Sequence, residues 1–507
     1  MILLGRLRGA LRYLLLGAAL FDVALYLFVV FRRIGFPFEL EWMEGGAVDH
    51  VLRILHGLPL YAKPSLTFVP YIYPPLYYYL SAAASLVLGE GFFPLRVISF
   101  AASIGAFAMV FMIVRRETAN IFAGIIGAAL FAATFPLSDG WFDIGRVDSL
   151  FIFLLLVAIY FIRFVPTRGG YIVAGIFIIL SYLTKQTALG ISFALMLYCA
   201  LVDWRKSLWF IGTVGFLAVA SFLILNHIYD GWYAYYLYKL PAGHALEWPI
   251  LATFWVRDIL PPLAVSILIA VLYLAIGDVE SGRRRYFYPL LALGMVGWGL
   301  LSRMHIGGYV NVLIPVHAVI AILCGIAIPR LTEYFQREAP EKARGIEAFI
   351  SIAFIVQFAL LAYNPRKIIP APGDVAAGGR MLDAMRSIRG DIFMEHHSYL
   401  PVLAGKNSNA QGQAILDILR GSDTASANAL KSELADAITH KKFGAIILDN
   451  TSIFDDVTPG NNWLKGLLQN NYTLRDTLHY PSNEFWPVVG SKTRPEYIYV
   501  PVGLPAE

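Results

Sequence analysis

The chain has little charge and a large excess of apolar residues. Charged residues make up 15% of its 507 residues and hydrophobic residues make up 58%, and the mean hydropathy is +0.62. A soluble globular chain carries about a quarter charged residues. Several apolar stretches approach or exceed about 18 residues, the length at which a helix can span a bilayer. These values exclude an ordinary soluble protein and predict a polytopic membrane protein.

Cysteine, cleavage signals and repeats are also scarce. Cys199 and Cys324 lie in different apolar runs, so no cysteine metal motif and no disulfide are expected. No small-residue cleavage site follows the first apolar run, about residues 13–31, which we therefore interpret as a retained anchor. No internal repeat or low-complexity segment is evident. The net charge of +5 indicates membrane topology rather than binding to nucleic acid.

Eleven stretches are predicted to cross the membrane: residues 13–31, 94–114, 119–137, 148–164, 170–186, 188–203, 207–226, 258–276, 286–302, 311–328 and 346–363. The apolar run 73–89 is left out because it is short, opens with two prolines and holds three consecutive tyrosines, which favour the membrane surface. With this assignment nearly every short basic cluster falls on one side, as the positive-inside rule requires. We therefore expect a multi-pass protein of the inner or plasma membrane with a cytoplasmic N-terminus.

The predicted fold is mainly α. Residues 1–364 form a bundle of about eleven transmembrane helices, with an outer loop, 32–93, that carries interfacial helices at about 46–56 and 73–89. Residues 365–507 are more polar. There, helices are expected at 381–388 and 427–439 and strands at 391–394 and 443–448, a pattern typical of a small α/β domain. An odd number of spans places this C-terminal domain on the extracytoplasmic side.

Two acidic motifs are predicted to share the outer face. Glu39, Glu41 and Glu44 lie together in the loop after the first span, and Asp148 begins a later span. The three glutamates could form a solvated acidic turn, and Asp148 could be a helix cap or first-turn acid favoured by the helix dipole. Alternatively, Glu44 and Asp148 could supply the base, or the metal ligands, that a glycosyl transfer requires.

Four cations stand at the outer ends of spans: Arg96, Arg146, Lys185 and Arg303. Each could extend toward the interface or pair with a loop carboxylate. Phosphate is the other natural partner for such groups. Lys185 is the most unusual, because it lies in a tight turn between two apolar helices, where an ammonium group is costly.

The order of these motifs resembles the GT-C glycosyltransferases, specifically the family 39-like group that includes protein O-mannosyltransferases and lipid A aminoarabinose transferases. The resemblance covers about residues 1–330. Its motifs, in order, are Glu41-Trp42-Met43-Glu44, a helix ending at Gly57, Tyr73-Pro74-Pro75-Leu76, Arg96, the pair Arg115-Arg116, Arg146-Val147-Asp148, Thr184-Lys185 and Gly308-Tyr309-x-Asn311.

The resemblance implies transfer of a hexose or pentose from a polyprenyl-phosphate donor to an acceptor on the outer face, with inversion. Glu44 then corresponds to the first-loop catalytic acid or base and Asp148 to the second acidic residue. Lys185, Arg146, Arg303, Tyr73 and Tyr309 would bind the donor and its phosphate.

The first-loop motif departs from the family. The family usually shows Asp-Glu, whereas this chain has Met43-Glu44 with Glu41 three residues earlier. Which of Glu41 and Glu44 acts therefore stays open, as does dependence on Mg²⁺ or Mn²⁺ held by Glu44 and Asp148.

Other functions are compatible with the sequence. A lipid-linked glycan transporter is one, although transporters usually show internal repeats. A non-catalytic binder of lipid-linked sugars is another. Besides the donor and membrane lipid, the expected partner is an acceptor that is a protein, a lipid or a polysaccharide, and not a nucleic acid.

Overall fold

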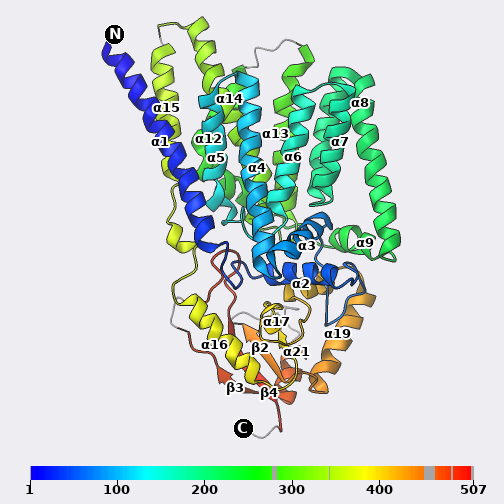
Figure 1. The fold of residues 1–507 in the computed structure, drawn as a ribbon. Helices are drawn as coiled ribbons and strands as arrows, with labels where there is room; N and C mark the ends of the chain where they lie inside the picture. Colours follow the sequence, from blue (N-terminus) through cyan, green and yellow to red (C-terminus); the bar gives the residue numbers. More distant parts are fainter. Residues whose placement is uncertain (1, 277–281, 342, 450–462, 481–483, 504–507) are drawn as a thin grey trace.

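The structure is a computed structural model that describes residues 2–276, 282–341, 343–449, 463–480 and 484–503. A helical bundle forms one end of the molecule and a smaller α/β region forms the other, and the N-terminus lies at the far end of the bundle from that region (Figure 1). The long bundle helices are α1 (Ile2–Arg33), α4 (Phe92–Thr118), α5 (Ile121–Ala133), α6 (Asp148–Phe164), α7 (Arg168–Tyr182), α8 (Thr187–Ile228), α12 (Leu260–Ile276), α13 (Phe287–Met304), α14 (Ile314–Glu338) and α15 (Ala343–Leu361).

Each predicted span overlaps one of these helices. Two of them, 188–203 and 207–226, are the two parts of α8, which bends at Asp203 where the backbone leaves helical geometry (φ −151°, ψ 93°). By length and composition, seven helices in the described part of the chain could cross a membrane. A multi-pass membrane bundle is therefore confirmed, whereas the count of eleven spans stays a prediction.

Two short helices lie across the end of the bundle that faces the α/β region (Figure 1). They are α2 (Glu44–Leu55) and α3 (Leu76–Leu88), which confirms the helices predicted near 46–56 and 73–89. Gly89 ends α3 with a φ of +85°, a conformation that residues with a Cβ rarely adopt. Both helices belong to the connection between α1 and α4, residues 34–91, which we call the α1–α4 connection.

The C-terminal region contains a four-stranded sheet in the order β1-β2-β4-β3. Strand β1 (Ile392–Met394) pairs in parallel with β2 (Ala445–Asp449). Strand β4 (Pro495–Pro501) is antiparallel to both β2 and β3 (Tyr472–Thr477). Its helices are α16 (Asp374–Ser387), α17 (Leu400–Leu403), α18 (Gly412–Arg420), α19 (Thr424–Thr439) and α21 (Trp463–Asn471). The predicted α/β character is confirmed; the domain boundary after residue 364 stays a prediction.

Between α8 and α12 the chain forms short helical segments: α9 (Trp232–Ala234), η2 (Tyr235–Lys239), α10 (Leu240–Ala242), α11 (Ile250–Thr253) and η3 (Phe254–Ile259). Four 3₁₀ turns complete the described helices: η1 (Phe135–Ser138), η4 (Gly282–Tyr286), η5 (Val310–Leu313) and η6 (Pro365–Lys367). Of these, η1 and η5 lie next to the site described below.

One hydrophobic core joins the α1–α4 connection to the C-terminal region. Val48 and Val51 of α2 belong to the same buried cluster as Phe393 of β1, Ile415 of α18 and Leu430 of α19. Burial of apolar surface is the main force that holds such layers together. The C-terminal region is therefore packed onto the connection that carries the acidic motif, and its loops reach the site from a fixed position.

Candidate active site

A cavity of about 320 Å³ opens where the bundle, the α1–α4 connection and the C-terminal region meet. Its lining comes from segments far apart in the sequence: Trp42, Met43, Tyr71, Ile72, Tyr73, Trp141, Arg146, Glu247, Ile306, Gly307, Gly308, Tyr309, Asn311, Val312, Gln413, Asp417, Gly490 and Ser491. Three of the predicted donor-binding residues, Arg146, Tyr73 and Tyr309, are among them.

Glu44 lies at the first residue of α2 and is fully buried. Its carboxylate accepts four hydrogen bonds: from Arg96 Nε (3.0 Å) and Nη2 (2.7 Å), from the amide of Gly145 (2.6 Å) and from the amide of Leu40 (2.7 Å). Burial by itself would raise the pKa of Glu44, but Arg96 and the two amides lower it below the ordinary value. These contacts give Glu44 a structural role that ties three segments together.

Glu41 is equally buried but has a different environment. Neither of its carboxylate oxygens makes a hydrogen bond within the described residues. Its nearest cation is Arg146, whose Nη1 lies 3.7 Å from Oε2. Burial raises the pKa of Glu41 to about 8, while Arg146 and a weaker backbone contact from Met43 oppose this with smaller effects. A carboxylate with such a pKa is suited to exchange protons near neutral pH.

Arg146 points its guanidinium into a cage of aromatic rings. Its Cζ lies 4.9 Å from the ring centre of Trp141, 5.5 Å from Tyr73 and 5.8 Å from Tyr71. Nη2 donates to the Tyr73 hydroxyl at 3.3 Å, and Nη1 makes no hydrogen bond within the described residues. Arg146 lines the cavity, and a buried guanidinium with an N–H that makes no hydrogen bond is a suitable receptor for phosphate.

Asp148 and Lys185 form a buried ion pair of 2.6 Å. The same Asp148 oxygen, Oδ1, accepts a hydrogen bond from the side-chain amide of Asn311 at 3.0 Å, and Asn311 lines the cavity. The other oxygen, Oδ2, makes no hydrogen bond within the described residues. Lys185 therefore lies next to Asp148, and Asp148 holds the side chain of Asn311, which lines the cavity.

Arg303 and Tyr309 hold the turn at residues 306–309, which forms part of the cavity lining. Arg303 pairs with Asp258 at 2.8 Å and donates to the carbonyl of Gly308 at 2.7 Å, and it is not part of the lining. The Tyr309 hydroxyl donates to Asp139 at 2.8 Å, and Asp139 also accepts from the amide of Gly490 at 2.6 Å. All four of the cations singled out in the sequence thus have a carboxylate neighbour.

The C-terminal region contributes residues that the sequence reasoning did not find. Gln413 and Asp417 of α18 line the cavity together with Gly490, and Gln413 donates to Asp417 at 2.9 Å. Gly490 has a φ of +75°, and an added Cβ there would lie 2.9 Å from Glu41 Cγ. No local motif marks these positions, because their role depends on packing across more than one segment.

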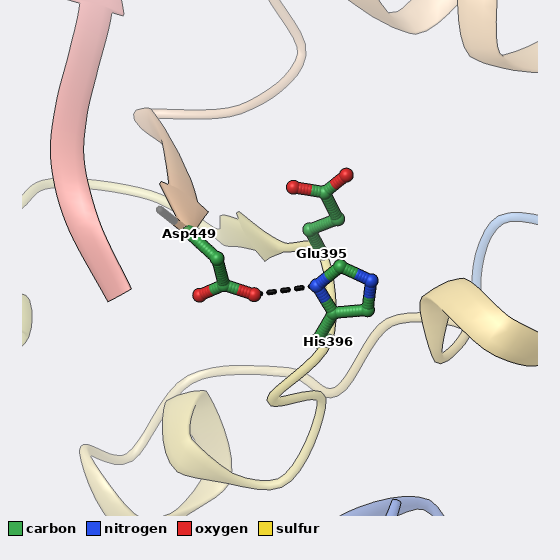
Figure 2. Close-up of side chains that lie close together, drawn as sticks. All are labelled: Glu395, His396 and Asp449. Atoms are coloured by element: carbon green, nitrogen blue, oxygen red, sulfur yellow. Dashed lines mark hydrogen bonds and ion pairs between the residues drawn. The ribbon is translucent and has the colours of Figure 1, made fainter. Parts of the chain in front are cut away.

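A second cluster of ionisable groups lies at the edge of the sheet. Figure 2 shows Glu395, His396 and Asp449 close together at the ends of β1 and β2, with His396 in contact with Asp449. Within the described part of the chain they are the one group of three donors placed to hold a metal ion. The metal ligands proposed from the sequence, Glu44 and Asp148, are not in that group. The two carboxylate oxygens of Glu44 already accept hydrogen bonds from four N–H groups.

Comparison with known proteins identifies the architecture. Residues 73–229, less than half of the chain, match the family described as dolichyl-phosphate-mannose-protein mannosyltransferase. The fold matches ArnT from Cupriavidus metallidurans bound to undecaprenyl phosphate, with a TM-score of 0.60, 12% identity, and coverage of 96% of this chain and 98% of that chain. The chain has the GT-C fold.

A second GT-C protein has a similar structure. The archaeal oligosaccharyltransferase AglB from Archaeoglobus fulgidus, in complex with an inhibitory peptide and a dolichol-phosphate, matches with a TM-score of 0.54 and 13% identity, covering 93% of this chain and 80% of that chain. No curated protein sequence matches the chain. The family match and the shared fold together support a membrane GT-C glycosyltransferase that uses a lipid-linked donor.

Proposed function

We propose that this GT-C protein transfers a hexose or pentose from a polyprenyl-phosphate donor to an acceptor hydroxyl on the extracytoplasmic face of the membrane. The observation that carries the proposal is the pairing of Glu41 with Arg146 beside the cavity. Neither carboxylate oxygen of Glu41 has a side-chain hydrogen-bond partner within the described residues, and Arg146 Nη1 likewise makes no hydrogen bond there. A sugar transfer from a lipid phosphate needs both a base and a phosphate receptor.

The donor phosphate binds to Arg146. The aromatic cage of Trp141, Tyr73 and Tyr71 fixes the plane of the guanidinium, so its N–H groups are oriented before the ligand arrives. Tyr309 and Asn311 line the same cavity and supply further polar groups. The relatives with undecaprenyl phosphate or dolichol-phosphate bound support a polyprenyl carrier.

Glu41 acts as the base. It takes the proton of the acceptor hydroxyl while the acceptor oxygen bonds to the anomeric carbon of the sugar. The bond from that carbon to the phosphate oxygen breaks, and the phosphate leaves with the electron pair. Attack opposite to the leaving group inverts the anomeric configuration. Glu41 is fully buried and does not line the cavity, whereas its neighbour Arg146 does. Transfer therefore requires the guanidinium to move toward the donor phosphate, so that the acceptor hydroxyl can reach Glu41.

Glu44, Asp148 and Lys185 position these groups. Glu44 fixes Leu40, Gly145 and Arg96, and thereby the backbone on both sides of Glu41 and Arg146. Asp148 and Lys185 orient Asn311. Of the two metal ligands proposed from the sequence, Asp148 could still bind Mg²⁺ or Mn²⁺ through Oδ2, which makes no hydrogen bond within the described residues. Glu44 does not fit as a ligand, because its two oxygens already accept four hydrogen bonds.

The topology is proposed together with the chemistry. The C-terminal region lies at the end of the bundle opposite the N-terminus (Figure 1), and Gln413, Asp417 and Gly490 of this region line the cavity. A cytoplasmic N-terminus, which the positive-inside rule favours, then places the cavity and the C-terminal region outside. The acceptor class, whether protein, lipid or polysaccharide, is decided by experiment.

A transfer assay tests the proposal. The full chain is purified in detergent and incubated with a panel of polyprenyl-phosphate hexoses and pentoses, with and without EDTA, and release of polyprenyl phosphate is measured. We expect release with one donor in the panel, faster when the native acceptor is added from an envelope extract. Absence of both turnover and binding for every donor would contradict the proposal and favour transport. Binding of a donor without turnover, even with extract present, would favour a non-catalytic binder.

A further inference from the structure

The cluster at the edge of the sheet is separate from the sugar-transfer cavity and has no role in the chemistry proposed above. Glu395 and His396 follow directly after β1, and Asp449 ends β2. Because β1 and β2 are parallel, their carboxyl ends meet at one edge of the sheet, where loops after strands commonly form binding sites. All three side chains are buried, with exposed fractions of 0%, 6% and 3%.

The donor atoms converge from the two strand ends. One ligand atom from each residue lies within 4.8 Å of the others, and His396 Nδ1 lies 2.6 Å from Asp449 Oδ2 (Figure 2). Ligands about 2.1 Å from one tetrahedral ion are about 3.4 Å from one another. Small side-chain rotations would therefore complete a three-ligand site. The ion would displace the proton shared by His396 and Asp449, and their direct contact would open.

The side chains around the cluster are also of the kinds that bind metal ions. His397 forms an ion pair with Glu39 of the α1–α4 connection, and its Nε2, which makes no hydrogen bond within the described residues, lies 3.4 Å from Asp449 Oδ1. Three buried carboxylates, Glu39, Glu395 and Asp449, therefore lie together with two buried imidazoles, His396 and His397. Carboxylate oxygens and imidazole nitrogens are the ligand types that a divalent transition-metal ion favours.

Contacts around the cluster hold it in a fixed geometry. The Gln411 side chain donates to the His396 carbonyl at 3.1 Å, and the amide of Gly412 donates to the Glu395 carbonyl at 2.7 Å. The ring of Trp42 packs edge-on against His396 with centroids 5.1 Å apart. Trp42 also lines the sugar-transfer cavity, so the cluster is one side chain away from that site.

We infer that Glu395, His396 and Asp449 bind a divalent transition-metal ion, with zinc as the best match, that fastens the C-terminal region to the α1–α4 connection. An imidazole nitrogen with two carboxylate oxygens suits zinc or manganese better than magnesium, which favours all-oxygen sites. The ion binds the two strand ends directly and reaches the connection through two contacts, Trp42 on His396 and Glu39 on His397. Its role is structural, and metal binding does not depend on the sugar-transfer proposal.

The test is metal content. The full chain is purified through a tag without histidines and without chelator, and its metals are measured by inductively coupled plasma mass spectrometry. We expect about one zinc or manganese ion per chain, lost in Glu395→Gln and His396→Ala. His440→Ala is the matched control, because His440 also pairs with a carboxylate, Asp436, but on the exposed surface of α19; it keeps the metal.

A second measurement uses the wild-type chain alone, in case the variants fail to fold. After removal of metal with EDTA, we expect the thermal midpoint to fall and to recover on addition of zinc or manganese but not of magnesium. Purified protein without metal that also fails to bind added zinc or manganese would overturn the inference. So would metal retained equally in Glu395→Gln, His396→Ala and the control. Because metal content is read directly, this result is independent of whether any sugar donor is turned over.

Discussion

Arg96 and Glu44 form a two-point buried ion pair, with Arg96 Nε and Nη2 on the two oxygens of one carboxylate. The remaining acceptor capacity of Glu44 is taken by the amides of Leu40 and Gly145. The pair therefore joins α4, the start of α2 and the segment before α6. For this reason we propose Glu41, three residues earlier, rather than Glu44 as the carboxylate that acts on the substrate.

Removing one partner of this pair is expected to destabilise the fold. Arg96→Ala leaves the buried carboxylate without its counter-charge, which costs about 3–5 kcal/mol. Thermal unfolding in detergent measures the effect. Arg386→Ala is the control, since its pair with Asp383 is exposed and such pairs contribute about 0–1 kcal/mol. Equal midpoints for the two variants would contradict the structural role of Glu44.

The transfer rate is expected to rise with pH toward about pH 8. Burial raises the pKa of Glu41 to about 8, and a general base works only when it is deprotonated, so the active fraction grows as pH increases through that value. A profile of kcat/KM between pH 5.5 and pH 9 tests this, with about a tenfold rise per unit on the acid side. A rate that is flat from pH 5.5 upward would show that the base has an ordinary carboxylate pKa.

Arg146→Lys is expected to weaken donor binding. Lysine keeps the positive charge but has no planar guanidinium for the aromatic rings to hold. It also cannot donate two parallel N–H···O hydrogen bonds to one phosphate. A hydrogen bond to a charged group contributes about 1.5–3 kcal/mol, so the Kd for undecaprenyl phosphate should rise about tenfold or more. Arg53→Lys is the control: Arg53 also lies over an aromatic ring, Phe68, at 4.1 Å, but outside the cavity. An equal effect in both variants would argue against phosphate binding by Arg146.

Gly490→Ala is expected to reduce transfer through a direct clash. Gly490 has a φ of +75°, and its added Cβ would lie 2.9 Å from Glu41 Cγ and 3.1 Å from Trp42 Cδ1. Gly405→Ala carries the same backbone strain at a φ of +78° but meets no atom within 4 Å. Transfer rates and thermal midpoints of the two variants separate the clash from the strain. If both lose activity equally, the C-terminal region does not act on the site through Gly490.

The sequence predicted the architecture well because the signals are local. Apolar length and the positions of basic loops are properties of single segments, so the bundle helices, the crosswise helices α2 and α3 and the α/β region could all be found. The reason to propose Glu41 rather than Glu44 could not be found in the sequence. It depends on Arg96 and Gly145, which reach Glu44 from 52 and 101 residues away in the chain.

The contributions of the C-terminal region were missed for a related reason. Gln413, Asp417 and Gly490 reach the cavity because α18 and the segment before β4 pack against the α1–α4 connection. The sheet-edge cluster is different, because Glu395, His396 and Asp449 each follow or end a strand that the sequence did predict. The rule that parallel strand ends converge would have been enough to bring them together.

The most direct test of the central claim is the transfer rate of Glu41→Gln. The substitution keeps the shape of the side chain and removes the base, so kcat should fall about 10²–10⁴-fold, while the thermal midpoint and the Kd for undecaprenyl phosphate stay near the wild-type values. Such a result would assign the proton transfer to Glu41. A variant that folds, binds the lipid phosphate and transfers sugar at the wild-type rate would show that Glu41 is not the base and would contradict the account.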